Sequence, residues 1–136
     1  MCLALRYLAT DRLGVGEHAG FEWNVVHNRM GHRCGYVRVL PGHPWFGKRT
    51  TAIEAFAHGD WPLNFARAGR ACPTHGADAE WWVGFDCAHF SDAPDLSLPV
   101  DLRVLPAGRG AVVRSQAYVE AECRSLCEQA AAAVAR

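Results

Sequence analysis

The chain has 136 residues, a length typical of one domain with a single core and too short for two independent cores. Half of its residues are apolar and 21% are charged, which is the composition of a globular protein and excludes a disordered one. Its 14 basic and 14 acidic side chains cancel, so nonspecific binding of nucleic acid is not expected.

Two strands are predicted in the first third of the chain. Apolar and polar residues alternate over Phe21–Val26, the period-two pattern of a half-buried strand, and we expect this to be the first strand of the sheet. The second strand is Gly35–Leu40, which Pro41 and Gly42 end. The pair is expected to form an antiparallel hairpin with a rather long loop.

The segment that follows, Pro41–Lys48, carries two prolines, two glycines and two aromatic residues. It is too interrupted for regular structure and too apolar for solvent, so we expect a rigid, packed loop. Thr51–Glu54 fits a capping box, which predicts a short helix to about Ala57, with a strand as the alternative. The small and polar residues of 67–79 indicate a surface loop.

Trp81–Cys87 is predicted to be an interior strand. Trp81, Val83 and Phe85 fall on one face, and Trp82, Gly84 and Asp86 fall on the other. Residues 91–110 contain three prolines and are expected to be irregular.

A helix is predicted from about Ser115 to Ala135, where apolar residues repeat at helical spacing. The repeating residues are Val119, Cys123, Leu126, Cys127, Ala130 and Val134. The predicted fold class is therefore α+β: one domain over residues 1–136, with a small, mainly antiparallel sheet covered on one face by a C-terminal helix.

The expected location is the cytoplasm. No apolar run approaches the roughly 20 residues that span a bilayer, and the start, Met1–Arg6, lacks the pattern of a secretory signal. Two of the six cysteines, Cys123 and Cys127, lie one helical turn apart on the apolar helix face. They are expected to be reduced thiols in the core.

The end of the third strand carries candidate functional residues. Gly84–His89, followed by Asp92, brings two carboxylates, an imidazole and a thiol to one place, where a rigid scaffold can position them. Asp86 and His89 are candidate catalytic residues. An equally open interpretation is that Asp86 caps the next turn, Cys87 packs, and His89 bonds a carbonyl group.

Two further histidines lie at predicted bends. His43 stands between Gly42 and Pro44, and His58 precedes Gly59. Imidazoles exposed at bends suit acid–base chemistry, which makes His58 a third candidate catalytic residue. Each histidine taken alone could instead bond to the backbone of its own turn.

Four residues offer an alternative zinc site: Cys72, His75, Cys87 and His89. Two thiolates and two imidazoles are the right number and type of ligands for tetrahedral zinc. Their spacing is not a standard one, and such pairs arise by chance in a chain with six cysteines and seven histidines. We therefore expect no cofactor, with zinc as the alternative.

Three segments in order resemble a family of small uncharacterised phage and bacterial proteins. They are Gly35–Lys48, His58-Gly59, and Trp81–His89 with Asp92, and the helical segment Tyr118–Cys123 is similar as well. The resemblance covers roughly residues 20–130 and implies no particular activity. The family's middle pattern is His-Gly-Gly, an aliphatic residue, then Thr-Tyr. This chain departs from it and has Asn64 as the nearest polar substitute, which indicates a different ligand or a lost activity.

The leading functional hypothesis is binding, sequestration or turnover of a small polar or anionic, nucleotide-like molecule. His43 and Lys48 would contact charge, and Trp45 and Trp82 would wall the site. Asn64 and Asp92 would add ligand contacts, and His43, Lys48, His58, Asp86 and His89 are expected to converge at neighbouring strand ends. The alternatives are a metal-dependent or acid–base hydrolase and a protein-interaction or inhibitor module that uses exposed tryptophans.

Overall fold

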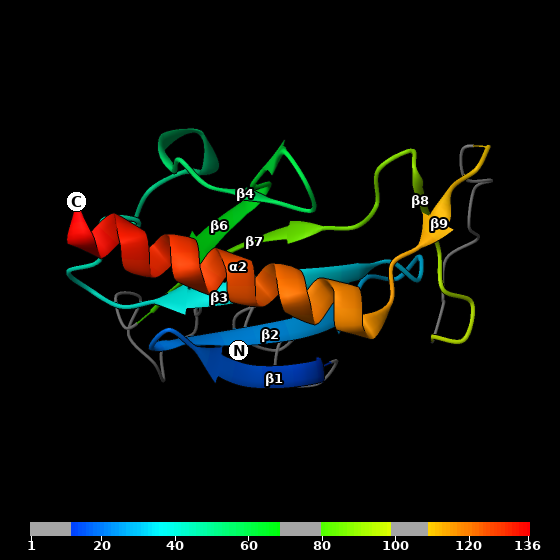
Figure 1. Ribbon diagram of the computed structural model, residues 1–136, viewed down its shortest axis with the longest axis horizontal. Helices are drawn as coiled ribbons and strands as arrows, with labels where there is room; N and C mark the ends of the chain where they lie inside the picture. Colours follow the sequence, from blue (N-terminus) through cyan, green and yellow to red (C-terminus); the bar gives the residue numbers. More distant parts are fainter. Residues whose placement is uncertain (1–11, 69–79, 99–108) are drawn as a thin grey trace.

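The computed structural model describes residues 12–68, 80–98 and 109–136, and it shows one long helix lying across a sheet (Figure 1). Every neighbouring pair in the five-stranded sheet is antiparallel, which confirms the predicted α+β class. The spatial order is β1 (Arg12–His18), β2 (Phe21–His27), β3 (Arg33–Val39), β7 (Trp81–Asp86) and β6 (Phe65–Ala68).

β2 and β3 form the predicted antiparallel hairpin, but the expectation that β2 is the first strand is wrong. β1 precedes β2 and pairs with it at the edge of the sheet. At Gly16 a Cβ atom would lie 2.4 Å from the Trp23 ring, so a glycine is needed for the indole to lie across this strand. Because β1 has glycines in place of apolar side chains, its sequence shows no alternation of apolar and polar residues. The strand was therefore not predicted.

β7 is an interior strand between β3 and β6, as predicted. Val83 and Phe85 belong to the main core, whereas Trp82 packs on the opposite face with Val26 and Cys34. β6 occupies the first part of the expected surface loop, and residues 69–79 lie outside the described part of the chain.

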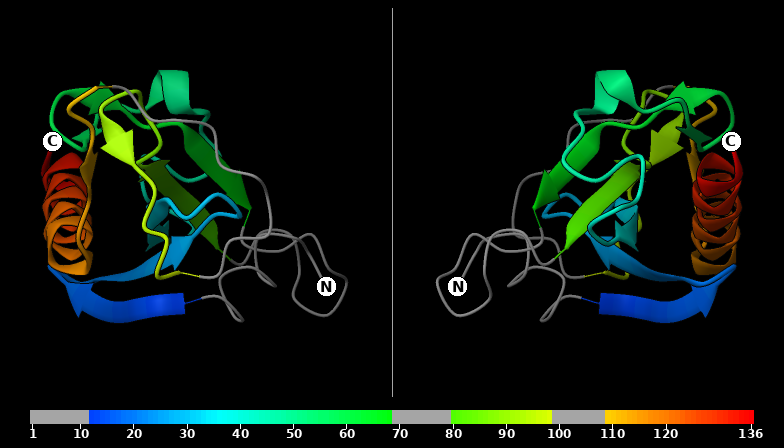
Figure 2. Two further views of the ribbon diagram at one scale, coloured as in Figure 1. Left: turned by 90° about the vertical axis from the view of Figure 1, so that its right-hand side faces the viewer. Right: turned by 90° about the vertical axis from the view of Figure 1, so that its left-hand side faces the viewer.

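Helix α2 (Gln116–Ala135) covers one face of the sheet, as Figure 2 shows from the side. It begins after Ser115, whose hydroxyl accepts a hydrogen bond from the Tyr118 backbone N–H at 3.1 Å. The predicted apolar face is buried from Val119 to Ala130. Val134 is the exception, because it is 59% exposed in the last turn, where the helix runs past the strands (Figure 1).

The helix and the sheet approach closely at Gly35. A Cβ atom at this position would lie 2.5 Å from the Phe85 ring and 2.6 Å from the Cys123 sulfur. Cys123 and Cys127 are free and buried, as expected, and burial raises the pKa of the Cys127 thiol to about 12. They act as packing residues between the helix and the sheet.

The predicted capping-box helix is wrong. Only one short turn of 3-10 helix forms (η1, Thr50–Ala52), and no side chain caps it. The alternative strand forms only at the end of this stretch, at Phe56–Ala57. Burial nevertheless alternates with a period of two, because Ile53, Ala55 and Ala57 are buried while Glu54 and Phe56 are exposed. Within this stretch, β4 (Phe56–Ala57) pairs with β5 (Trp61–Pro62) as a small antiparallel hairpin.

The segment expected to be irregular contains one short strand, β8 (Asp92–Ala93). It pairs in parallel with β9 (Val112–Val113), which leads into α2. Residues 99–108 lie outside the described part. Across the three described ranges, α2 included, no helix is long and apolar enough to cross a bilayer.

Candidate functional site

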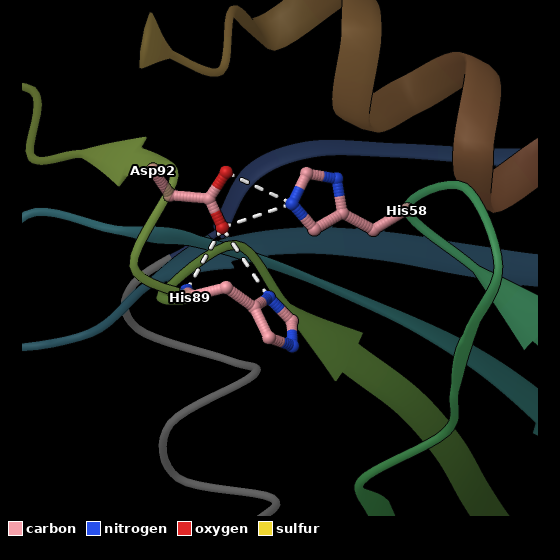
Figure 3. A group of neighbouring side chains, drawn as sticks. All are labelled: His58, His89 and Asp92. Carbon is pink, nitrogen blue, oxygen red and sulfur yellow. Dashed lines mark hydrogen bonds and ion pairs between the residues drawn. The ribbon is translucent and has the colours of Figure 1, made fainter. Parts of the chain in front are cut away.

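A buried carboxylate, Asp92 at the start of β8, lies at the centre of the candidate site (Figure 3). Its side chain is 0% exposed. Nε2 of His58 lies 2.9 Å from both carboxylate oxygens. Nε of Arg114 donates to Oδ1 at 2.7 Å, and the backbone N–H of His89 donates to Oδ2 at 2.9 Å. Every oxygen of the buried group therefore has partners, as burial requires.

His58 reaches Asp92 from the turn between β4 and β5. Its φ of 57° lies in the left-handed region, and Gly59 follows with a φ of 79°. The left-handed conformation costs a non-glycine residue roughly 1–2 kcal/mol, and contacts with α2 offset it. Nδ1 of His58 lies 2.7 Å from the Tyr118 hydroxyl, and the Gly59 N–H donates to Glu122 at 3.0 Å.

His89 approaches the same carboxylate from the turn between β7 and β8. Its Nδ1 lies 3.3 Å from Oδ2 of Asp92, and its ring stacks on Trp61 with centroids 4.1 Å apart and planes 19° apart. Unlike His58, its side chain is 21% exposed. Figure 3 shows the other ring nitrogen turned away from Asp92.

Asp92 is held in its ionised form. Burial by itself would raise the pKa of Asp92, but hydrogen bonds from Arg114, from the His89 backbone and from His58 lower it below its ordinary value of 3.8. The same contact with Asp92 raises the pKa of Arg114, whose guanidinium lies over the Tyr118 ring at 5.4 Å. The centre is thus a carboxylate paired with a permanent cation and two imidazoles.

The structure brings together three of the predicted site residues, His58, His89 and Asp92. Asp86 is not among them. It stands opposite Cys34 on the neighbouring strand β3, and both lie on the sheet face away from the helix. Its carboxylate accepts a hydrogen bond from the Ala88 N–H at 3.2 Å. Asp86 therefore caps the following turn, which was the alternative interpretation.

The expectation that His43 and Lys48 join this site is wrong. β3 and β7 are antiparallel, and Val39 at the end of β3 pairs with Trp81 at the start of β7. The loop after β3 and the turn after β7 therefore lie at opposite ends of the sheet, measured along the strands. His43 contacts Ala130 of α2, whereas His58 contacts Tyr118, and these two helix positions lie about 18 Å apart at the rise of an α-helix.

His43 fastens its loop to the helix. Its Nδ1 accepts a hydrogen bond from the Trp45 backbone N–H at 2.9 Å, so Nε2 carries the proton and donates to the Ala130 carbonyl at 2.9 Å. Burial lowers the pKa of His43, although the bond to Ala130 opposes this effect. Lys48, in the same loop, is exposed.

The two tryptophans predicted to wall the site are core residues. Trp45 packs in the main core, and Trp82 packs on the opposite sheet face, where its indole N–H donates to Glu80 at 3.1 Å. Asn64 is exposed, and its backbone N–H bonds to the Gly84 carbonyl at 3.1 Å. The aromatic ring at the cluster is Trp61 instead.

Half of the predicted zinc set, Cys72 and His75, lies outside the described residues, so this set stays a prediction. Cys87 is buried in the main core, and burial raises the pKa of its thiol, which disfavours the thiolate that zinc needs. The described residues that could hold a metal ion are His58, His89 and Asp92.

Three residues of the cluster were not predicted: Trp61, Arg114 and Tyr118. Tyr118 lies in the helical segment that resembles the phage and bacterial family, which was the one available signal for it. Trp61 and Arg114 stand in no recognisable motif, and their roles follow from tertiary packing.

Comparisons of the chain with protein-family models, with curated proteins and with solved structures find no match. The resemblance to phage and bacterial proteins therefore stays a prediction. The class that the fold and the site define is an α+β protein with a His–Asp–His cluster around a buried carboxylate at one end of its sheet.

Proposed function

We propose that the protein binds a small polar or anionic, nucleotide-like molecule at the exposed side of the His58–Asp92–His89 cluster. In this proposal His89 transfers protons to or from the bound molecule. The observation that supports it most strongly is the fully buried Asp92 carboxylate, which orients the ring of a partly exposed histidine. Hydrolysis by acid–base chemistry is the form of turnover that such a pair favours.

The hydrogen bonds assign a role to each ring nitrogen of His89. With Nδ1–H donating to Asp92, Nε2 keeps its lone pair and faces away from the carboxylate. A carboxylate that holds a histidine in this tautomer also stabilises the imidazolium that forms when Nε2 takes a proton. His58 is fully bonded, because its Nε2–H donates to Asp92 and its Nδ1 accepts from Tyr118. His89 is therefore the proton carrier.

Trp61 and Arg114 supply recognition. Trp61 is 48% exposed and offers a flat apolar surface beside His89, which suits an aromatic ring. Arg114 uses Nε to bind Asp92, and a guanidinium has further N–H groups that can bind an anion. A molecule that joins a flat ring to a phosphate would use both features.

The test uses the full chain, freed from metal by a chelator, with adenosine 5′-monophosphate, adenosine and inorganic phosphate as probes. Nuclear magnetic resonance would follow the Trp61 indole N–H and the His89 ring nitrogens. We expect adenosine 5′-monophosphate to shift both sets of signals, and more strongly than either fragment does.

The matched pair of variants is His89→Gln and His18→Gln. His18 also lies 3.3 Å from a carboxylate, that of Glu128, but on the exposed surface. His89→Gln should weaken binding of adenosine 5′-monophosphate, and His18→Gln should not. Absence of any probe-induced shift, or equal weakening by both variants, would refute the proposal.

A further inference from the structure

We propose that His58, Asp92 and His89 are the protein ligands of a divalent cation of the zinc class. One ligand atom from each residue lies within 4.8 Å of the other two. Two imidazoles and one carboxylate form a common ligand set of catalytic zinc sites, which use three protein ligands and keep a fourth position open.

Two of the three distances between ligand atoms already approach those of a metal site. Ligand atoms about 2.0–2.1 Å from a tetrahedral zinc ion lie roughly 3.3 Å from one another. Nδ1 of His89 is 3.3 Å from Asp92, and Nε2 of His58 is 2.9 Å from it. The first pair needs no movement, and the second needs the His58 ring to move outward by a few tenths of an ångström. The two imidazole nitrogens, which lie up to 4.8 Å apart, would have to approach each other by up to about 1.5 Å.

The facing atoms require either a ring proton or a metal ion between them. An imidazole nitrogen without its proton and a carboxylate oxygen are both acceptors, so at 2.9 Å they repel unless a proton or a metal ion lies between them. Zinc would replace the two ring protons, one on His58 and one on His89. Each neutral imidazole would then carry its proton on the other ring nitrogen, so zinc binding need release no proton to solvent.

Two of the three ligands, His58 and Asp92, also have outer partners, as metal ligands usually do. With zinc at Nε2 of His58, its Nδ1–H would donate to the Tyr118 hydroxyl 2.7 Å away. Arg114 donates to Oδ1 of Asp92, and the His89 backbone N–H donates to Oδ2. These bonds hold the carboxylate in place while leaving each oxygen a further lone pair for the cation.

The charge balance predicts the class of the fourth ligand. Arg114 cancels the charge of Asp92, so the bound cation keeps its two positive charges and favours hydroxide or an anion in the open position. His89 is the exposed member of the set, so this position would open on its side. In the zinc-bound protein His89 would be a ligand and not a proton acceptor, so this inference does not depend on the proposed function of the metal-free protein.

Zinc fits better than iron(II), which also uses two histidines and one carboxylate but needs several open positions. His58 and Asp92 are buried, and Trp61 covers one face of the His89 ring. The available space favours four-coordination.

The test is metal analysis of the full chain purified without added metal, followed by zinc titration in competition with a chromophoric chelator. Cobalt(II) absorption would report the coordination number. We expect one zinc ion per chain and the intense visible bands of four-coordinate cobalt. His89→Gln should lower zinc affinity by at least about 100-fold, and Tyr118→Phe, which removes an outer partner, by about 10–100-fold.

His18→Gln is again the matched control and should leave zinc affinity unchanged. Circular dichroism of His89→Gln would verify the fold, which this partly exposed ring does not determine. The inference is overturned if the parent binds zinc no more tightly than His89→Gln, if His18→Gln lowers affinity equally, or if six-coordinate iron(II) or manganese(II) binds in preference. Because the ligand test uses metal-free protein, failure of one proposal is distinguishable from failure of the other.

Discussion

The two ends of the sheet both present histidines at tight turns, but they use them in opposite ways. His43 bonds to backbone groups, the Ala130 carbonyl and the Trp45 N–H. His58 bonds to side chains, those of Asp92 and Tyr118. Backbone partners lock the imidazole of His43 into one neutral tautomer, whereas the carboxylate beside His58 accepts its ring N–H and is itself a possible metal ligand. The partner of a histidine, more than its turn, indicates whether it can carry chemistry.

Removal of the carboxylate should have the largest effect. Asp92→Ala leaves the Arg114 guanidinium and the His58 ring without their partner, and breaking a buried pair in this way costs about 3–5 kcal/mol. Urea unfolding would measure the loss. Glu22→Ala is the control, since it breaks a more exposed ion pair with Arg38 and should cost about 1 kcal/mol or less. Equal losses would mean that the cluster has no special energetic role.

At the opposite end of the sheet, His43→Ala should lower the free energy of unfolding by less than Asp92→Ala does. The substitution removes one bond to the Ala130 carbonyl and leaves the Trp45 N–H without its partner, which costs about 1–3 kcal/mol. Urea unfolding measures this loss, and the chelator competition should show unchanged zinc affinity. A lower zinc affinity in this variant would show that the two ends are coupled.

Lowering the pH should remove the stabilising contributions of His43 and of Asp92, at opposite ends of the sheet, in different pH ranges. The pKa of His43 is lowered from 6.5 by burial, so its stabilising contribution is present above pH 6.5 and is lost as the pH falls from there toward the folded-state pKa. The pKa of Asp92 is lowered from 3.8, so its contribution is present above that value and is lost only at lower pH.

Unfolding free energies of the parent, His43→Gln and Asp92→Asn between pH 3 and 8 would separate these two contributions. His43→Gln should flatten the curve just below pH 6.5, and Asp92→Asn should flatten it below 3.8. If instead Asp92→Asn flattened the curve just below pH 6.5 and His43→Gln flattened it below 3.8, the directions of the two pKa shifts would be contradicted.

Lys48→Ala should have the smallest effect. Its side chain is exposed in the His43 loop, and surface changes of this kind alter stability by less than about 0.5 kcal/mol. Binding of adenosine 5′-monophosphate, followed by nuclear magnetic resonance, should also be unchanged. A tenfold weaker binding would restore Lys48 to the ligand site.

Elements with a clear period could be predicted from the sequence. The α2 face from Val119 to Ala130 and the two faces of β7 follow from spacing alone, because burial imposes that spacing on each element. β1 escaped prediction because its glycines carry no side chains to alternate. The β4 stretch resembled a capping box, but the burial of Ile53 and Ala55 in the core overrode that local signal.

The sequence by itself determined the α+β class and indicated His58, His89 and Asp92 as polar residues at the ends of elements. Only the tertiary structure decided that they meet, that Trp61, Arg114 and Tyr118 surround them, and that His43 does not. The physical reason is antiparallel pairing, which places the last residues of β3 and of β7 at opposite ends of the sheet. No local pattern records which strands become neighbours, so distant residues find their partners only in the folded chain.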